Sequence, residues 1–240
     1  DFTADDTITV KATPTATGAA PTKAAARLWG EPTAGQMAVF VGDMQVSEAV
    51  DVGADGSYAI AVKAADVLKQ GNVVPNGDPI TLTAKFVGNN NMADAAGTVN
   101  VNISAVAKVE KNGSTTYVGN LEDEFKTEND GATITLLDNV KMTKSIDISA
   151  GSFTLDLNGY TVSSTAAQTY YVINGGITIK DSGTGGKIQC EGKGIEIRGG
   201  IVSVESGTVS GYYGVEISGG TGALSGDAVI SCCDTGLHVT

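Results

Sequence analysis

The clearest pattern along the chain is an alternation of apolar and polar positions that recurs through its second half. Three segments have apolar residues at their first and third positions and a glycine pair at their fifth and sixth: Tyr171–Gly176, Ile195–Gly200 and Val215–Gly220. A fourth copy begins at Leu237, and successive copies start 24, 20 and 22 residues apart. Alternation with a period of two indicates β-strands that bury one face. A near-constant repeat of this length predicts coils that stack on one another around a common core.

Two further sets of apolar positions lie between these segments, which suggests three strands in each coil. The first inward row is predicted to contain Ile146/Ile148, Tyr171/Ile173, Ile195/Ile197, Val215/Ile217 and Leu237/Val239. The second is predicted to contain Leu155/Leu157, Ile177/Ile179 and Val202/Val204, and the third Val162, Ile188, Val209 and Val229. The pattern therefore predicts a parallel β-helix over residues 132–240, with about 4.8 Å between coils.

The first part of the chain has a different pattern, with short alternating runs separated by Gly, Asn, Asp and Pro. The predicted strands are Thr7–Lys11, Ala24–Trp29, Met37–Val41, Tyr58–Val62, Ile80–Phe86 and Val99–Ile103. Turn signals such as Gly42-Asp43 and Pro75-Asn76-Gly77 lie between them. Strands and turns at this spacing predict a β-sandwich over residues 1–104. A short helical turn is expected over Ala65–Gln70.

Residues 105–131 are expected to form a linker with a short capping helix. Asn120 could cap a helix that begins with the acidic run Leu121–Glu124. Leu121 and Phe125 are four residues apart and would face one core. An amphipathic helix here would cover the first coil of the β-helix.

Two resemblances extend this interpretation. The segments Met37–Gly42, Asp55–Tyr58 and Ile80–Asn89 resemble bacterial Ig-like repeat domains, and the similarity covers about residues 19–104. Asp130–Leu137 and Leu155–Val162 resemble the pectate-lyase-like, right-handed β-helix region of surface proteins from anaerobic gut Firmicutes, over about residues 106–240. The first resemblance implies a non-catalytic spacer or adhesive module, and the second implies the fold more specifically than any activity.

Charge and hydropathy exclude several classes of partner. The chain has 27 acidic and 15 basic residues and a formal net charge of −12. A negative field of this size repels phosphate backbones, so nucleic-acid binding is not expected. No apolar run approaches the ~20 residues of a membrane span, so membrane insertion of this segment is not expected. Because the chain begins at Asp1 and stops within a coil, we expect a fragment of a secreted or cell-surface protein.

Candidate chemistry lies on the outward positions of the coils. One predicted outward column contains Glu196, Glu216 and His238, and its neighbour contains Arg198. Two glutamates about 5 Å apart would raise the pKa of one of them. Such pairs can act on glycosidic bonds or bind Ca²⁺. The alternative, which we favour, is a solvated ladder of charges that pair with one another and keep the β-helix soluble.

Aromatic residues supply the other candidates for binding. Tyr212 and Tyr213, together with Glu196, Arg198 and Glu216, are the predicted ligand-binding residues. The only tryptophan, Trp29, could stack on a sugar but is more readily explained as a core residue of the sandwich. Asp51–Gly56 has two acidic residues at turn spacing but lacks further calcium ligands, so a plain turn is expected. No metal, cofactor or catalytic residue is predicted.

The cysteines occur only in the β-helix. Cys190 and Cys232 each lie five residues before a repeat, so they are predicted to occupy one column two coils apart. That separation exceeds the Cα–Cα range of a disulfide. A ring between adjacent Cys232 and Cys233 would be strained. We therefore expect three free thiols.

These observations favour an all-β protein, an Ig-like β-sandwich followed by a right-handed parallel β-helix with a capping helix. The expected function is a non-catalytic module of a bacterial surface or secreted protein that binds a polysaccharide or a host or cell-surface protein. A truncated polysaccharide lyase or glycoside hydrolase is the alternative from another class. A structural stalk without a ligand is the third.

Overall fold

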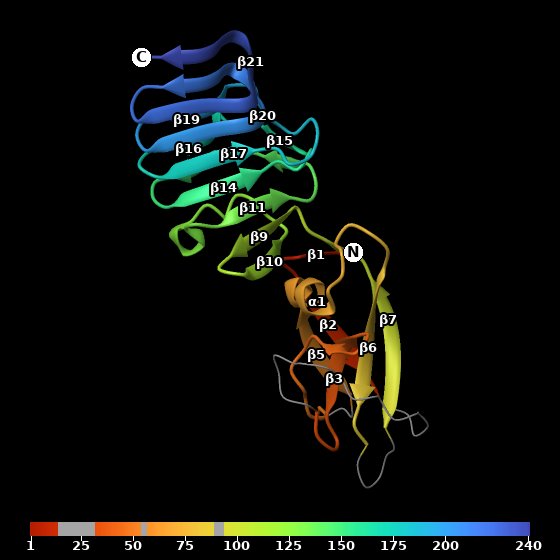
Figure 1. The fold of residues 1–240 in the computed structure, drawn as a ribbon. Helices are drawn as coiled ribbons and strands as arrows, with labels where there is room; N and C mark the ends of the chain where they lie inside the picture. Colours follow the sequence, from red (N-terminus) through yellow and green to blue (C-terminus); the bar gives the residue numbers. More distant parts are fainter. Residues whose placement is uncertain (14–31, 54–56, 89–93) are drawn as a thin grey trace. The chain divides into compact units, whose positions relative to one another are not determined.

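The computed structural model describes residues 1–13, 32–53, 57–88 and 94–240, and within them the protein is all-β, with 57% strand and 5% helix. The chain divides into two compact units, Asp1–Ala105 and Val106–Thr240 (Figure 1). In its described part, the first contains small sheets and one helix. The second is a β-solenoid of about 5 turns.

The described residues of the first unit form two antiparallel sheets and one short parallel pair. The larger sheet has the strand order β4-β3-β6-β7, formed by β4 (Met44–Gln45), β3 (Met37–Val41), β6 (Ile80–Phe86) and β7 (Ala95–Val101). The second pairs β2 (Thr7–Ala12) with β5 (Tyr58–Lys63), and the parallel pair joins β1 (Phe2–Thr3) to β8 (Ile103–Ser104). The ring of Tyr58 packs 5.8 Å from that of Phe86, which joins the two antiparallel sheets in one core.

Sequence patterns locate most of these elements. Burial alternates strictly along β5, so its period-two pattern corresponds to one buried face. The expected helical turn is the two-turn helix α1 (Ala64–Gly71), which buries Val67 and Leu68. The last predicted strand, Val99–Ile103, is instead the end of β7 followed by β8. The predicted strand Ala24–Trp29 and residues 54–56 of the predicted turn Asp51–Gly56 lie outside the described residues.

The solenoid has three parallel faces, and every coil contributes one strand to each. The first face contains β11 (Thr133–Leu136), β14 (Ser152–Asp156) and β17 (Gly176–Lys180). The second contains β12 (Val140–Met142), β15 (Thr161–Ser164) and β18 (Lys187–Cys190). The third contains β13 (Ile146–Ile148), β16 (Gln168–Val172) and β19 (Lys193–Ile197). The long strands β20 (Ile201–Ile217) and β21 (Thr221–Val239) each run through all three faces (Figure 1).

Parallel pairing places inward residues of successive coils above one another. The column Val140, Val162, Ile188, Val209 and Ile230 forms the core of the second face. Phe153, Ile177, Val202 and Gly222 form a column on the first face. Most of these side chains are almost completely buried. The hydrophobic effect along these columns is the main force that holds the coils together.

The predicted core rows require three corrections of register. On the third face Tyr170 and Val172 point inward, because they pair with Ile195 and Ile197, whereas Tyr171 and Ile173 were predicted there. On the first face the inward pair of β14 is Phe153/Leu155 rather than Leu155/Leu157. In the last coil Ile230 replaces Val229, which is 51% exposed. Each error occurs where two apolar residues are adjacent or where the alternation continues past the end of the strand. Alternation alone therefore does not fix the register.

A hairpin and an irregular segment cover the first coil, and the predicted capping helix is wrong. The antiparallel strands β9 (Ala107–Lys111) and β10 (Ser114–Val118) extend the first face through pairing of β9 with β11. Residues 121–125 form turns, and the only helical segment described nearby is the 3₁₀ helix Thr127–Asn129. The Asn120 side chain accepts a hydrogen bond from the Glu122 backbone N–H, which favours a turn over a helix.

The hydrophobic part of the cap prediction is confirmed. Leu121 and Phe125 are both buried and belong to the solenoid core. The Phe125 ring packs edge-on against Phe153 and Tyr170, at centroid distances of 5.5 and 5.4 Å. Aromatic pairs with this geometry stabilise beyond simple area burial. The cap therefore works through two buried side chains on irregular backbone.

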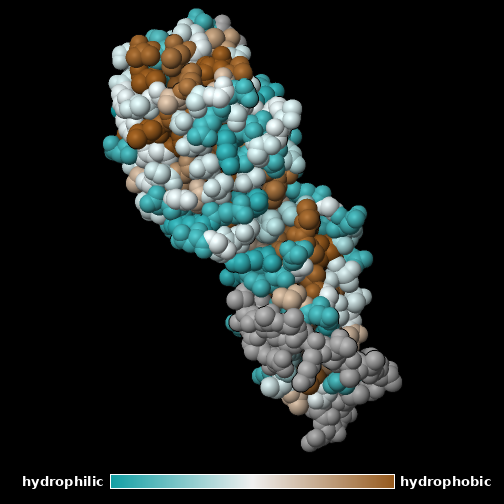
Figure 2. Space-filling view, in the orientation of Figure 1, coloured by the Kyte–Doolittle hydropathy of each residue, from teal (hydrophilic) through white to brown (hydrophobic). Residues whose placement is uncertain are grey.

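At the other end of the solenoid, apolar residues of the last coil are exposed. Figure 2 shows hydrophobic side chains gathered at the end where β21 lies. Leu224, Leu237 and Val239 are 49%, 46% and 65% exposed. These residues occupy the same columns as the buried core of the preceding coils.

Candidate functional site

The outward positions of the third face form a compact surface of charged and aromatic residues. Its central column contains Asp147, Tyr171, Glu196, Glu216 and His238, one residue from each coil. Lys193 and Tyr213 are paired in the column on one side. Arg198 follows Ile197 on the other side. We call these residues, together with Tyr212, the third-face cluster.

Lys193 links the two glutamates of the central column. Its ammonium lies 3.0 Å from Glu196 Oε2 and also contacts Glu216 Oε2. The side chain of Glu196 is 5% exposed and that of Glu216 is 13% exposed. Two carboxylates this close would repel one another without a shared cation. Lys193 therefore holds both glutamates in place.

Arg198 completes the pairing of Glu196 and also contacts an aromatic ring. Arg198 Nε donates a hydrogen bond of 2.8 Å to Glu196 Oε1. Its guanidinium carbon lies 5.1 Å from the centroid of the Tyr171 ring, a cation–π arrangement. The side chain of Arg198 is 57% exposed, so the guanidinium remains accessible to a ligand.

Aromatic side chains lie beside this charge network. The rings of Tyr212 and Tyr213 meet edge-on at 5.0 Å. The Tyr213 ring stacks on the imidazole of His238 at 4.7 Å with an interplanar angle of 14°. His238 Nδ1 is 3.5 Å from Glu216 Oε1. Tyr212 is 51% exposed and presents its ring to solvent.

The electrostatic balance at Glu196 lowers its pKa. Burial alone would raise the pKa of Glu196, but the hydrogen bonds and charges of Lys193 and Arg198 outweigh it, so the pKa lies below its ordinary value. Burial lowers the pKa of Lys193, but Glu216 and Glu196 raise it by more. Glu196 is therefore ionised at neutral pH and is not suited to act as a general acid.

The structure brings together all five residues predicted from the sequence and adds two. Glu196, Arg198 and Glu216 lie in one network, and Tyr212 and Tyr213 lie beside it. Lys193 was missed because it lies two residues before inward Ile195, so alternation along the strand would point its side chain inward. Tyr171 was missed because the register of β16 was wrong by one residue.

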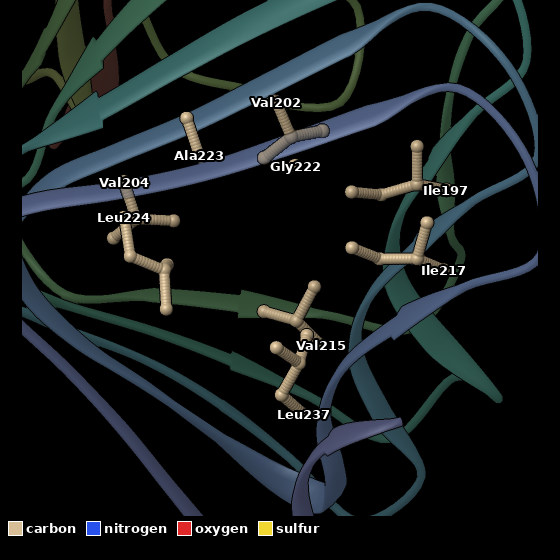
Figure 3. A pocket seen from close by; sticks show the side chains of 9 residues that line it. All are labelled: Ile197, Val202, Val204, Val215, Ile217, Gly222, Ala223, Leu224 and Leu237. Carbon is tan, nitrogen blue, oxygen red and sulfur yellow. The ribbon is translucent and has the colours of Figure 1, made fainter. Parts of the chain in front are cut away.

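An apolar cavity lies near the exposed end of the core (Figure 3). Its volume is about 30 Å³, and its lining includes Val202, Val204 and Leu224 from the first face. Figure 3 also shows Ile197, Ile217, Val215 and Leu237 pointing into the same space from the third face. The hollow is lined by apolar side chains, and two of them, Leu224 and Leu237, are themselves about half exposed to solvent. It is a packing gap beside Gly222 with no room for a substrate.

The other residues singled out in the sequence, which are the cysteines, Trp29 and the acidic turn, lie away from the third-face cluster or outside the described residues. Cys190 is buried and its thiol donates to the Ala166 carbonyl, and Cys232 is exposed; both are free. Trp29 and residues 54–56 of the acidic turn are not described, while Asp51 accepts a hydrogen bond from Gln36. Over the described ranges, no group of three or more His, Cys, Asp or Glu residues could hold a metal ion.

Comparisons with known proteins give no relative. No family model matches the chain, no curated protein matches it, and no solved structure matches it. Among the described residues, no helix has the length and apolar character needed to cross a membrane. Any functional assignment therefore depends on the geometry of the third-face cluster.

Proposed function

We propose that the third face of the solenoid is a non-catalytic binding surface for a polysaccharide, in a secreted or cell-surface bacterial protein. The observation that supports this is the combination of an exposed aromatic ring, Tyr212, with a guanidinium held over Tyr171 on a sheet surface. Sugar rings bind proteins by stacking on aromatic faces and by hydrogen bonding to charged groups.

The rigidity of the cluster favours binding. Arg198 is fixed between Glu196 and the Tyr171 ring, and Tyr213 is fixed between Tyr212 and His238. Side chains already held in one geometry lose less conformational entropy when a ligand binds. The repeat of about 4.8 Å between coils also suits a polymer, because successive sugars can meet equivalent positions.

The charge of the protein favours a neutral polysaccharide over an acidic one. The net charge of −12 repels polyanions at long range. Within the cluster the two cations, Lys193 and Arg198, are already paired with glutamates. An acidic sugar would have to compete with these internal carboxylates for the same donors.

The same pairing argues against the enzymatic alternative for this cluster. Glycoside hydrolysis requires a carboxylic acid whose pKa is raised, together with a second carboxylate placed for attack or activation of water. Glu196 has a lowered pKa, and both glutamates are bound to Lys193. Neither is poised to transfer a proton to a sugar oxygen.

The sheets of the first unit fit a spacer in this proposal. The resemblance of residues 19–104 to bacterial Ig-like domains supports the idea of a module that separates the solenoid from a surface. The right-handed β-helix of the surface proteins described above likewise supports an extracellular setting.

Binding can be tested by co-sedimentation with insoluble polysaccharides. We expect the chain to be retained by at least one neutral polymer among xylan, mannan and cellulose, and to bind polygalacturonate more weakly. Tyr212→Ala should weaken retention by about tenfold, as expected when an exposed aromatic contact is removed. Tyr117→Ala, in β10 and away from the third face, is the matched control and should bind like the unmodified chain.

The same incubations distinguish the other functions. We expect neither reducing ends nor unsaturated products, with or without calcium. Product release that disappears in Glu196→Gln or Arg198→Ala would establish the enzyme instead. Failure to bind any of the polymers, with the fold intact by circular dichroism, would leave the structural stalk as the better interpretation.

A further inference from the structure

Four Asn-Gly pairs occur in the chain, at Asn76, Asn112, Asn158 and Asn174. In such a pair the glycine nitrogen can attack the asparagine side-chain carbonyl carbon. Ammonia leaves and a succinimide ring forms, and water then opens the ring to aspartate or isoaspartate. Glycine favours the attack because it has no Cβ to hinder the ring. The reaction needs both the side chain and the glycine nitrogen to be free.

Hydrogen bonds block the reaction at Asn76 and Asn158. The Asn76 side chain donates to the Ala105 carbonyl at 2.9 Å and accepts from the Ala105 N–H at 3.1 Å. The Asn158 side chain donates to the Leu136 carbonyl at 2.9 Å. The attacking nitrogen, that of Gly159, donates to Asp181 Oδ1 at 2.7 Å. Ring closure at either pair would have to break these bonds first.

Packing and a hydrogen bond protect the pair at Asn174. The Gly175 N–H donates to the Ile148 carbonyl at 3.3 Å. Gly175 is buried between coils, and an added Cβ there would lie 2.5 Å from an Ile148 methyl carbon. The backbone at this turn cannot rotate toward a succinimide geometry without moving the neighbouring coil.

Asn112 has none of these restraints. Asn112 and Gly113 form the two-residue turn between β9 and β10, with φ values of 51° and 76°. Both residues are exposed, and nothing lies within 4 Å of the Cβ position at Gly113. Neither the Asn112 side chain nor the Gly113 N–H has a hydrogen-bond partner among the described residues. We propose that Asn112 is the site at which the folded protein deamidates and forms isoaspartate.

The modification would act on the hairpin that covers the first coil. An isoaspartate adds one methylene to the backbone of a turn whose flanking residues, Lys111 and Ser114, are paired. It also adds a negative charge to an acidic protein. Because β9 pairs with β11, a distorted turn would weaken the edge of the first face.

Ageing the full chain at mildly alkaline pH tests the proposal. Peptide mapping by mass spectrometry should show deamidation at Asn112 roughly tenfold or more faster than at the other three pairs, since those must break hydrogen bonds first. Enzymatic methylation of isoaspartate should label the same peptide. In Asn112→Gln the early label should be absent.

The unfolded chain provides the control for sequence effects. In denaturant all four Asn-Gly pairs should react at similar rates, because glycine follows each asparagine. A native chain in which Asn76, Asn158 or Asn174 reacts as fast as Asn112 would overturn the proposal. So would a native rate at Asn112 as low as that of the protected pairs. Neither result depends on whether the third face binds a polysaccharide.

Discussion

Buried polar side chains of the solenoid fall into two groups, and each has a different effect on stability. Asp156 is 5% exposed and its Oδ1 accepts hydrogen bonds from the N–H groups of Ser182 and Asn158. The hydroxyl of Tyr170, in contrast, is buried with no hydrogen-bond partner among the described residues. A buried polar group stabilises the fold only when it is paired.

Removing the Tyr170 hydroxyl should therefore stabilise the protein. The Tyr170 side chain is completely buried, and this burial raises the pKa of its hydroxyl far above its ordinary value. We expect Tyr170→Phe to increase the free energy of unfolding by about 1 kcal/mol, because a desolvated, unpaired group is removed. Urea unfolding measures the change. Tyr171→Phe, on the exposed side of the same strand, is the control and should change stability little. A clear loss of stability in Tyr170→Phe would mean that its hydroxyl has a partner in solution.

The Asp156 side chain should stabilise the protein, and its contribution to the free energy of unfolding should depend on pH. Burial alone would raise the pKa of Asp156, but the hydrogen bonds from Ser182 and Asn158 and the charge of Lys180 lower it overall. Its contribution to stability is therefore complete above the unfolded-state pKa of about 3.9 and is lost as pH falls through the lower folded-state pKa. We expect Asp156→Ala to cost about 2 kcal/mol, since two partly buried N–H groups lose their acceptor and Lys180 loses its ion-pair partner.

Asp156→Asn separates the hydrogen bonds from the charge. The amide oxygen can still accept from the same N–H groups, so we expect a cost of only about 1 kcal/mol at neutral pH. Unfolding curves measured from neutral to acidic pH should show a smaller loss of stability in this variant than in the unmodified chain. An identical acid dependence in both proteins would contradict the role assigned to the Asp156 carboxylate.

At the scale of the elements, the turns between faces set how closely coils approach. Gly200 has a φ of 75°, and a Cβ added there would lie 2.0 Å from the carbonyl oxygen of Gly175 in the preceding coil. Gly185 also has a positive φ, 82°, but nothing lies within 4 Å of its Cβ position. The two glycines share the backbone requirement and differ only in the space around them.

This pair isolates the cost of coil-to-coil crowding. Gly185→Ala should cost about 1–2 kcal/mol, the strain of a left-handed backbone at a residue with a side chain. Gly200→Ala should cost at least about 3 kcal/mol or prevent folding, because the new methyl group clashes with a backbone oxygen that cannot move independently. Thermal unfolding of both variants gives the comparison. Equal losses would show that the coils can separate enough to accept a side chain.

Among the elements, the solenoid repeat could be predicted from the sequence, whereas the register of β16 and the backbone of the cap could not. Repeated apolar pairs followed by glycines predicted the solenoid, because a stack of coils requires the same pattern in each turn. The register of β16 was wrong because Tyr170, Tyr171, Val172 and Ile173 are all apolar or aromatic, so either parity gives a plausible inward face. The cap was predicted as a helix because Leu121 and Phe125 are spaced for one. A segment this short gains little from helix formation, and an Asn120 turn replaces it.

For the whole molecule, the sequence predicted where the charged residues of the candidate site lie. It did not predict how their charges shift one another's pKa values. The repeat placed Glu196 and Glu216 in one column, as the structure confirms. Their pKa behaviour depends on Lys193, which reaches both carboxylates from the edge of the coil. Such a contact depends on side-chain direction at a corner, which alternation along a strand does not specify. Glu196 and Glu216, whose spacing suggested acid–base chemistry, instead belong to an ion-pair network that positions Arg198.

Hydrogen–deuterium exchange with and without a soluble neutral polysaccharide tests the central proposal most directly, because it locates the bound polymer on the protein. With soluble xylan or mannan as the probe, we expect slower exchange in peptides of the third face, covering 168–173, 193–198, 212–218 and 235–240. Peptides of the first and second faces, such as 152–156 and 187–190, should be unchanged. Protection confined to those other faces, or absent at saturating concentrations of every polymer that the chain co-sediments with, would contradict the assignment of the third face as the binding surface.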